Sequence, residues 1–131
     1  AMRLAQSGFR VYWIGDSNTC SAQTGDLLIL GSGSGETEGL VGYIKKAVSL
    51  GMKKIVFTTN PHSTLAGYAD LLKVLKADAK YQSAGNKKSV QPMGSLFEEV
   101  LLIILEAIVL ELMERNHITE EYMREKHANL E

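Results

Sequence analysis

Short apolar runs alternate along the chain with segments of helical periodicity, and this alternation constrains the fold more than any other feature. We expect strands at the apolar runs, which are Arg10–Ile14, Asp26–Leu30, Lys54–Thr58 and Leu71–Leu75. Parallel strands need long crossover connections, usually helices, so strands that alternate with helices indicate a parallel sheet. The sequence therefore predicts a three-layer α/β/α protein with a parallel sheet covered by helices on both faces.

The expected helices follow from apolar spacing and from residues that suit helix ends. Thr37–Leu50 has its apolar residues on one face and stops before Gly51, a residue that suits the left-handed position after a helix. Asp78–Val90, rich in Lys, Gly, Ser and Asn, is typical of a mobile loop. Ala1–Gly8 has the form of a helix end, which indicates a missing upstream segment. The other expected helices are Ser63–Ala69, Leu96–Arg115, and Glu120–His127 with Thr119 as its cap.

Length and charge exclude several classes of protein. A chain of 131 residues suits one domain, so we expect a single domain over residues 1–131, partial at its N-terminus. With 14 basic and 15 acidic residues, nothing indicates nucleic acid or an anionic membrane as a partner. The lone Cys20 and the absence of a signal-peptide pattern favour a cytoplasmic location. The apolar stretch Leu96–Met113 contains glutamates that would be costly in lipid, which predicts a buried helix and no membrane span.

The segment DLLILGSGSGET connects an apolar strand to a helix through a glycine-rich turn. Glycine lets the backbone approach a ligand, a helix N-terminus offers unpaired N–H groups, and hydroxyls add donors, so the segment suits a phosphate monoester. Nucleotide binding is disfavoured because neither a Walker motif nor GxGxxG spacing is present. The alternative is a tight turn without a ligand. The candidate phosphate-binding residues are Ser32, Gly33, Ser34, Gly35 and Thr37.

Several segments resemble one protein family. The sequence S-G-S-G-E-T at Ser32–Thr37 resembles the phosphate-binding signature of SIS domains, which are flavodoxin-like proteins that bind phosphosugars. Thr58–Asp70 is similar to the next strand and turn of these domains, while Ser89–Met113 and His127–Glu131 resemble the 6-phospho-3-hexuloisomerases among them. The similarity covers essentially the whole chain. The first strand of the family's five-stranded sheet, and the Gly-Arg-Ser-Gly-like turn after it, have no counterpart here.

The resemblance implies an enzyme that interconverts D-arabino-hex-3-ulose 6-phosphate and D-fructose 6-phosphate through a cis-enediol. This reaction belongs to formaldehyde fixation by the ribulose monophosphate pathway. The resemblance also implies a homotetramer without a metal or organic cofactor. One alternative is a regulatory SIS module that binds a phosphosugar without turnover, although no DNA-binding domain is present. A second is an arabinose-5-phosphate isomerase, although such enzymes usually have extra C-terminal domains that this chain lacks.

An isomerase of this kind needs a base that moves a proton between neighbouring carbons, and one carboxylate can do this. Glu98 matches the glutamate that the family is thought to use. Spacing alone favours a different role, a capping box in which Ser95 and Glu98 close the helix end. His127 resembles a C-terminal histidine that is implied to transfer protons at substrate oxygens and often reaches the site of a neighbouring subunit. Its alternative is an exposed histidine near the end of a charged helix.

The remaining polar candidates have weaker support. Asn60, Ser63 and Thr64 follow a strand at the carboxyl edge of the sheet, where open α/β sheets bind ligands. They are candidates for the rim of the site, and ordinary turn chemistry explains them equally well. His62 and His117 form no convincing ligand cluster with acids or with the cysteine, so we expect no metal site.

Overall fold

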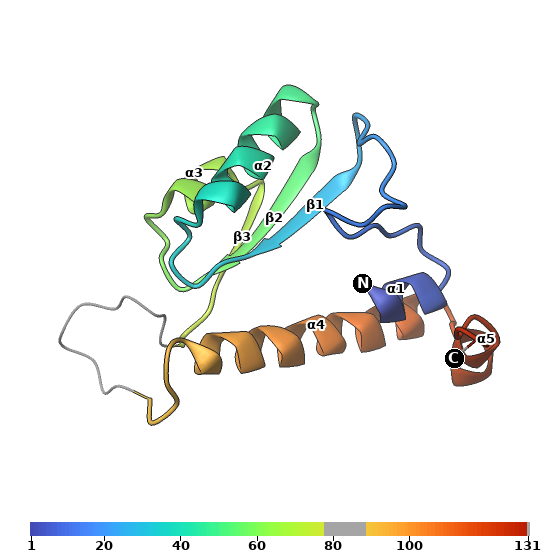
Figure 1. Ribbon diagram of the computed structural model, residues 1–131. Helices are drawn as coiled ribbons and strands as arrows, with labels where there is room; N and C mark the ends of the chain where they lie inside the picture. The colour runs from blue at the N-terminus through green and yellow to red at the C-terminus, as the bar shows by residue number, and fades with distance from the viewer. Residues whose placement is uncertain (78–88, 131) are drawn as a thin grey trace. The chain divides into compact units, whose positions relative to one another are not determined.

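The computed structural model describes residues 1–77 and 89–130, so that residues 78–88 of the expected mobile loop lie outside the described part. The elements, in chain order, are α1 (Met2–Gln6), β1 (Leu27–Gly31), α2 (Glu38–Ser49), β2 (Lys53–Thr58), α3 (Thr64–Tyr68), β3 (Leu71–Val74), α4 (Ser95–Arg115) and α5 (Glu120–Glu125) (Figure 1). They group into two compact units. We call Ala22–Ile103 the sheet unit, and Ala1–Ser21 with Ile104–Glu131 the terminal unit. The expectation of a single domain stays a prediction.

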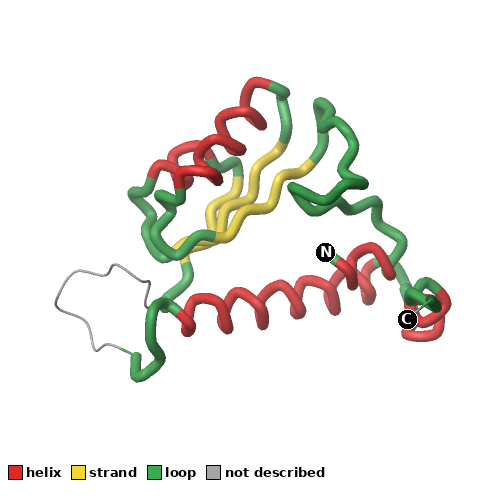
Figure 2. The backbone as a smooth tube through the Cα atoms, viewed as in Figure 1, coloured by secondary structure: helices red, strands yellow, loops and turns green. Residues whose placement is uncertain are grey.

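The sheet unit is built on a parallel sheet, as the sequence predicts. Its strands lie in the order β1-β2-β3 (Figure 2). Ile29 of β1 lies opposite Ile55 of β2, and Val56 lies opposite Leu72 of β3. α2 and α3 are the crossovers that bring the chain back for each new parallel strand.

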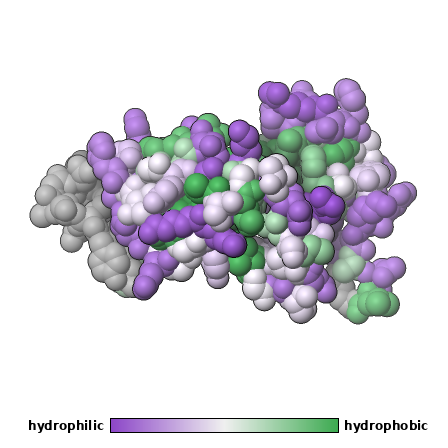
Figure 3. All heavy atoms as spheres, turned by 90° about the horizontal axis from the view of Figure 1, so that it is seen from above, coloured by the Kyte–Doolittle hydropathy of each residue, from purple (hydrophilic) through white to green (hydrophobic). Residues whose placement is uncertain are grey.

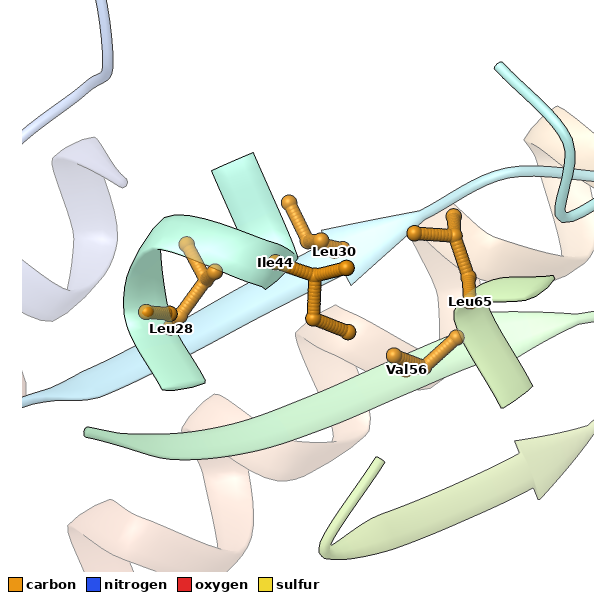
Figure 4. Packing of buried hydrophobic residues seen from close by; sticks show 6 residues of the cluster. Leu28, Leu30, Ile44, Val56 and Leu65 are labelled. Atoms are coloured by element: carbon orange, nitrogen blue, oxygen red, sulfur yellow. The ribbon is translucent and has the colours of Figure 1, made fainter. Parts of the chain in front are cut away.

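The core of the sheet unit lies between the sheet and α2 with α3. Ile44, Val56 and Leu65 are completely buried there, and each such burial stabilises the fold by about 1.5–3 kcal/mol. Ile44 and Ala47 are one helical turn apart, so α2 presents both to the sheet. The whole cluster consists of Leu28, Leu30, Ile44, Ala47, Val56 and Leu65, most of which Figure 4 labels.

The opposite face of the sheet is covered in part by the first half of α4. Successive strand residues point to opposite faces, so Gly31 faces away from the core that contains Leu28 and Leu30. Leu101 of α4 packs directly on it, because a Cβ on Gly31 would lie 2.5 Å from the Leu101 Cδ2 atom. Helices therefore lie against both faces of the sheet, which confirms the layered α/β architecture. Leu27 remains half exposed, and Figure 3 shows hydrophobic side chains at the surface among hydrophilic ones.

The strand expected at Arg10–Ile14 does not form, and that prediction was wrong. The segment has the apolar pattern of a strand, but a strand exists only where a neighbour completes its hydrogen-bond ladder. None of the described strands pairs with it. Its backbone instead enters a turn in which the Asp16 N–H donates to the Trp13 carbonyl at 3.1 Å, and the Trp13 side chain is 70% exposed.

In the terminal unit, α1 contacts α5. Gly8, with φ +88°, follows α1 and lies against Tyr122 of α5. An ion pair joins Arg3 Nε to Glu106 Oε2 at 2.9 Å. Thr119 caps α5 as expected, because its hydroxyl accepts the Tyr122 N–H at 3.2 Å.

The C-terminus of α4 is closed by a Schellman motif. The Ile118 N–H donates to the Met113 carbonyl at 2.9 Å, and the His117 N–H donates to the Glu114 carbonyl at 3.3 Å. His117 occupies the position usually taken by glycine, with φ +53°. Among the described residues, no helix is both long and apolar enough to cross a membrane.

Candidate functional site

The glycine loop, defined as residues Gly31 to Thr37, leaves the carboxyl end of β1 and is fixed to the end of β2. The Ser32 N–H donates to the Phe57 carbonyl at 3.0 Å and so extends the sheet by one bond. The Gly33 carbonyl accepts three hydrogen bonds, from the Thr59 N–H at 3.1 Å, the Thr59 hydroxyl at 2.8 Å and the Thr58 hydroxyl at 3.1 Å. The loop therefore has one defined backbone path.

Gly35 is required by its surroundings. Its φ of +70° lies in the left-handed region that favours glycine. A Cβ atom at this position would overlap the side chain of Ser63 and lie 3.0 Å from the Thr58 hydroxyl. The Gly35 carbonyl also accepts the Leu65 N–H at 3.1 Å, so the loop contacts the start of α3 without space between them.

The donors of the loop remain available for an anion. Thr37 is the N-cap residue of α2, yet its hydroxyl makes no cap bond and instead pairs with the Ser32 hydroxyl at 2.9 Å. Two hydroxyls that share one hydrogen bond leave one O–H free to donate. The N–H groups of Glu38, Gly39 and Leu40 have no acceptor among the described residues. A helix start with unpaired N–H groups beside a free hydroxyl suits a phosphate group.

Glu98 lies in the first turn of α4, and its carboxylate is exposed. The capping box does not form. The Ser95 hydroxyl donates to the Pro92 carbonyl at 2.7 Å, and the Glu98 N–H donates to the Gly94 carbonyl at 3.3 Å. The described residues provide no hydrogen-bond or ion-pair partner for this carboxylate. The capping-box alternative is therefore wrong for this pair.

Glu98 also lies one helical turn from the place where α4 contacts the end of β1. Residues three apart in a helix share a side, so Glu98 lies one turn from Leu101 on the same side of α4. Leu101 packs on Gly31, where the glycine loop begins. Within the sheet unit, this carboxylate thus stands one helical turn from Leu101, the residue that packs where the glycine loop begins.

Two of the three rim candidates, Ser63 and Asn60, make the turn contacts that were their alternative explanation. The buried Ser63 caps α3, because its hydroxyl accepts the Ala66 N–H at 3.3 Å. The Asn60 side chain accepts the His62 N–H at 3.0 Å. The Thr64 N–H donates to Glu36. A place of these residues at the rim of a ligand site stays a prediction.

Glu36 is a residue that sequence reasoning missed. Its Oε1 atom accepts the Thr64 N–H at 2.7 Å, and this bond, together with one from the Thr64 side chain, holds the pKa of Glu36 below its usual value. The contact joins the glycine loop to α3 across 28 positions of sequence, so no local spacing indicates it. Thr58 and Thr59 were missed for the same reason, since their hydroxyls bond to a loop 25 and 26 positions earlier.

The three histidines are exposed and come from different segments of the chain. His127 follows α5 in the terminal unit, is exposed, and has its Nδ1 atom 2.9 Å from the Ala128 carbonyl oxygen. His62 and His117 are exposed as well. Within the described part of the chain, no group of three or more His, Cys, Asp and Glu side chains is placed to hold a metal ion.

Comparison with known proteins decides the family. Residues 17–103 match the SIS domain. The chain belongs to the SIS domain family. Its glycine loop and the strands on either side of it fall inside the matched region, so the unpaired donors described above lie in an SIS domain.

Relatives along the whole chain define its place in the family. A 3-hexulose-6-phosphate isomerase of Bacillus subtilis is 44% identical over 131 residues, which cover 100% of this chain and 71% of that protein. One from Mycobacterium gastri is 41% identical, and the match covers 100% of this chain and 65% of that protein. A solved structure of a hypothetical protein from Methanococcus jannaschii, inferred to be a 3-hexulose-6-phosphate isomerase, is 35% identical with a TM-score of 0.88 and covers 100% of this chain and 69% of that one. The resemblance to hexuloisomerases within the SIS domain family is thereby confirmed.

Proposed function

We propose that this SIS domain serves as a sugar-phosphate isomerase that interconverts D-arabino-hex-3-ulose 6-phosphate and D-fructose 6-phosphate. The observation that carries the proposal is the pairing of two features in the sheet unit. The glycine loop offers unpaired N–H and O–H donors, and Glu98, whose carboxylate has no partner among the described residues, is one helical turn from Leu101, which packs where that loop begins. The names of the relatives support the choice of substrate.

In the proposed mechanism, the loop binds the phosphate group through neutral donors. Ser32, Ser34 and Thr37 supply hydroxyls, while Gly33 and Gly35 let the backbone approach the phosphate. The phosphate thus fixes the sugar chain at one end. Proximity of this kind converts the proton transfer into an effectively unimolecular step.

Glu98 is the proposed base. Its carboxylate removes the proton from C3 of fructose 6-phosphate, and the electrons form the C2–C3 double bond of a cis-enediol. The same carboxyl group then returns the proton to C2, which leaves the carbonyl at C3. A second proton must move from the C3 oxygen to the C2 oxygen, and the imidazole of His127 is proposed to transfer it, because an imidazole can both accept and donate a proton.

Deuterium exchange tests this proposal. The chain is incubated with fructose 6-phosphate in heavy water, and proton NMR follows the loss of the C3 proton signal. We expect exchange with the wild type and a loss of about 10²- to 10⁴-fold in Glu98→Gln. Glu99→Gln is the matched control, because Glu99 is the exposed neighbour in the same turn and accepts a hydrogen bond from the Gln91 side chain. Equal exchange in Glu98→Gln and wild type would refute the role of Glu98, and phosphosugar binding without any exchange would favour the regulatory SIS module.

The proposal includes a cytoplasmic homotetramer that acts in formaldehyde fixation by the ribulose monophosphate pathway. α4 supports self-association because it exposes large apolar side chains, with Leu102 at 60%, Ile103 at 67% and Leu110 at 66%. A helix that is apolar on several sides needs cover from another surface. Sedimentation that shows only monomer at micromolar concentration would contradict the tetramer.

A further inference from the structure

The Gly33 carbonyl is held more firmly than a loop carbonyl requires. It accepts three hydrogen bonds, two from Thr59 and one from the Thr58 hydroxyl, although a carbonyl oxygen has only two lone pairs. Thr58 is completely buried, and its hydroxyl also accepts the Asn60 N–H at 3.2 Å. Both threonines stand where β2 ends, and a β-branched valine would suit the strand equally well. The hydroxyls are thus the part of these side chains that the strand itself does not need.

The direction of the Gly33 carbonyl determines the direction of the next N–H group. The two point to opposite sides of a trans peptide plane, and the chain contains no cis peptide among the described residues. With the carbonyl fixed toward the end of β2, the Ser34 N–H must point away from it. This N–H has no acceptor among the described residues. It is therefore a prepositioned donor of the glycine loop.

We propose that Thr58 and Thr59 are positioning residues that orient the Gly33–Ser34 peptide so that the Ser34 N–H is ready for the phosphate group. They act through the peptide and not through contact with the substrate. Without the hydroxyls, only the bond from the Thr59 N–H is left of the three, and a peptide that rotates presents its carbonyl oxygen to an anion. Preformed donors stabilise a bound anion without reorganisation at the moment of binding. The inference rests on the proposed phosphosugar function and names the residues that shape its phosphate site.

The test compares Thr59→Val with Thr59→Ser. Valine keeps the shape but removes the shortest of the three bonds, and serine restores the hydroxyl. Calorimetry measures the dissociation constant of inorganic phosphate, and isomerisation of fructose 6-phosphate gives KM and kcat separately. In Thr59→Val we expect the dissociation constant of phosphate and the KM to rise by about five- to tenfold, the range of one net hydrogen bond. We expect kcat to change little. Thr59→Ser should bind phosphate as the wild type does.

A matched control separates positioning from stability. The Thr24 hydroxyl donates to the Leu50 carbonyl at 2.9 Å, a bond of the same type at the opposite end of the strands. Thr24→Val should lower the urea midpoint of unfolding and leave phosphate affinity unchanged. Thr58→Val removes the other side-chain hydroxyl that donates to the Gly33 carbonyl, and it should also weaken phosphate binding.

The outcomes are distinct. If Thr59→Val binds phosphate as tightly as wild type, or if Thr24→Val weakens phosphate binding equally, the positioning role is refuted. If the wild type binds no phosphate, both the positioning role and the phosphate site fail. If the wild type binds phosphate but isomerises nothing, and Thr59→Val still weakens binding, the positioning role stands and the proposed enzymatic function fails.

Discussion

Substitution of Gly35 by alanine should destabilise the sheet unit strongly. The left-handed backbone at φ +70° costs a residue with a Cβ about 1–2 kcal/mol. The new Cβ would also overlap the side chain of Ser63, and overpacking of a filled site costs about 1–3 kcal/mol. Ser63 cannot turn away without losing its cap bond to the Ala66 N–H. The sum predicts a loss of about 2–5 kcal/mol from the free energy of unfolding.

Urea unfolding followed by circular dichroism measures this loss. With a slope of about 2 kcal/mol per molar urea, the midpoint should fall by about 1–2.5 M. Gly42→Ala is the matched control, because Gly42 lies inside α2 and nothing is within 4 Å of an added Cβ there. This control should raise the free energy of unfolding by about 0.5–1 kcal/mol. A midpoint for Gly35→Ala at or above that of wild type would refute the reasoning, and a fall in both variants would point to a general intolerance of alanine.

Other substitutions test the core, a helix end and an ion pair. Leu65→Ala, at a completely buried site, should lower the free energy of unfolding by about 2–5 kcal/mol in urea titration. His117→Gly should raise the melting temperature, because glycine adopts the φ of +53° after α4 about 1 kcal/mol more easily. Lys54 holds the pKa of Asp70 below its usual value through hydrogen bonds and a 2.7 Å ion pair, so the pair stabilises the fold above about pH 4 and is lost as pH falls through the lower folded pKa. Asp70→Asn should therefore lower the urea midpoint at pH 7, by an amount that shrinks as the pH is lowered toward 2; a constant difference would contradict it.

Most of the sheet unit could be predicted from its sequence because its signals are local. The helix expected at Thr37–Leu50 forms as Glu38–Ser49, since apolar spacing defines its face and Gly51 supports its end with φ +69°. β2 was expected at Lys54–Thr58 and forms as Lys53–Thr58. The glycine loop was found because glycines and hydroxyls are visible as residue types. These features depend on neighbours within a few positions.

Features that depend on distant partners could not be predicted in the same way. The apolar pattern of Arg10–Ile14 is that of a strand, but pairing with another strand decides whether a strand forms. The capping box at Ser95 and Glu98 has the right spacing, yet the Pro92 carbonyl takes the serine hydroxyl. Glu36 has no local signal of its own, and only its contact with α3 shows its role.

The same long-range contacts explain how an acidic residue fits a loop proposed to bind an anion. The loop from Gly31 to Thr37 contains Glu36 and no basic residue. The Glu36 carboxylate already accepts the Thr64 N–H and hydroxyl, and its lowered pKa keeps it ionised in that bond. Its charge is thus used to connect the loop to α3. The proposal leaves the anion to the neutral donors of the loop and of α2. In the proposed site, the shape of the backbone, and not the sum of side-chain charges, selects the anion.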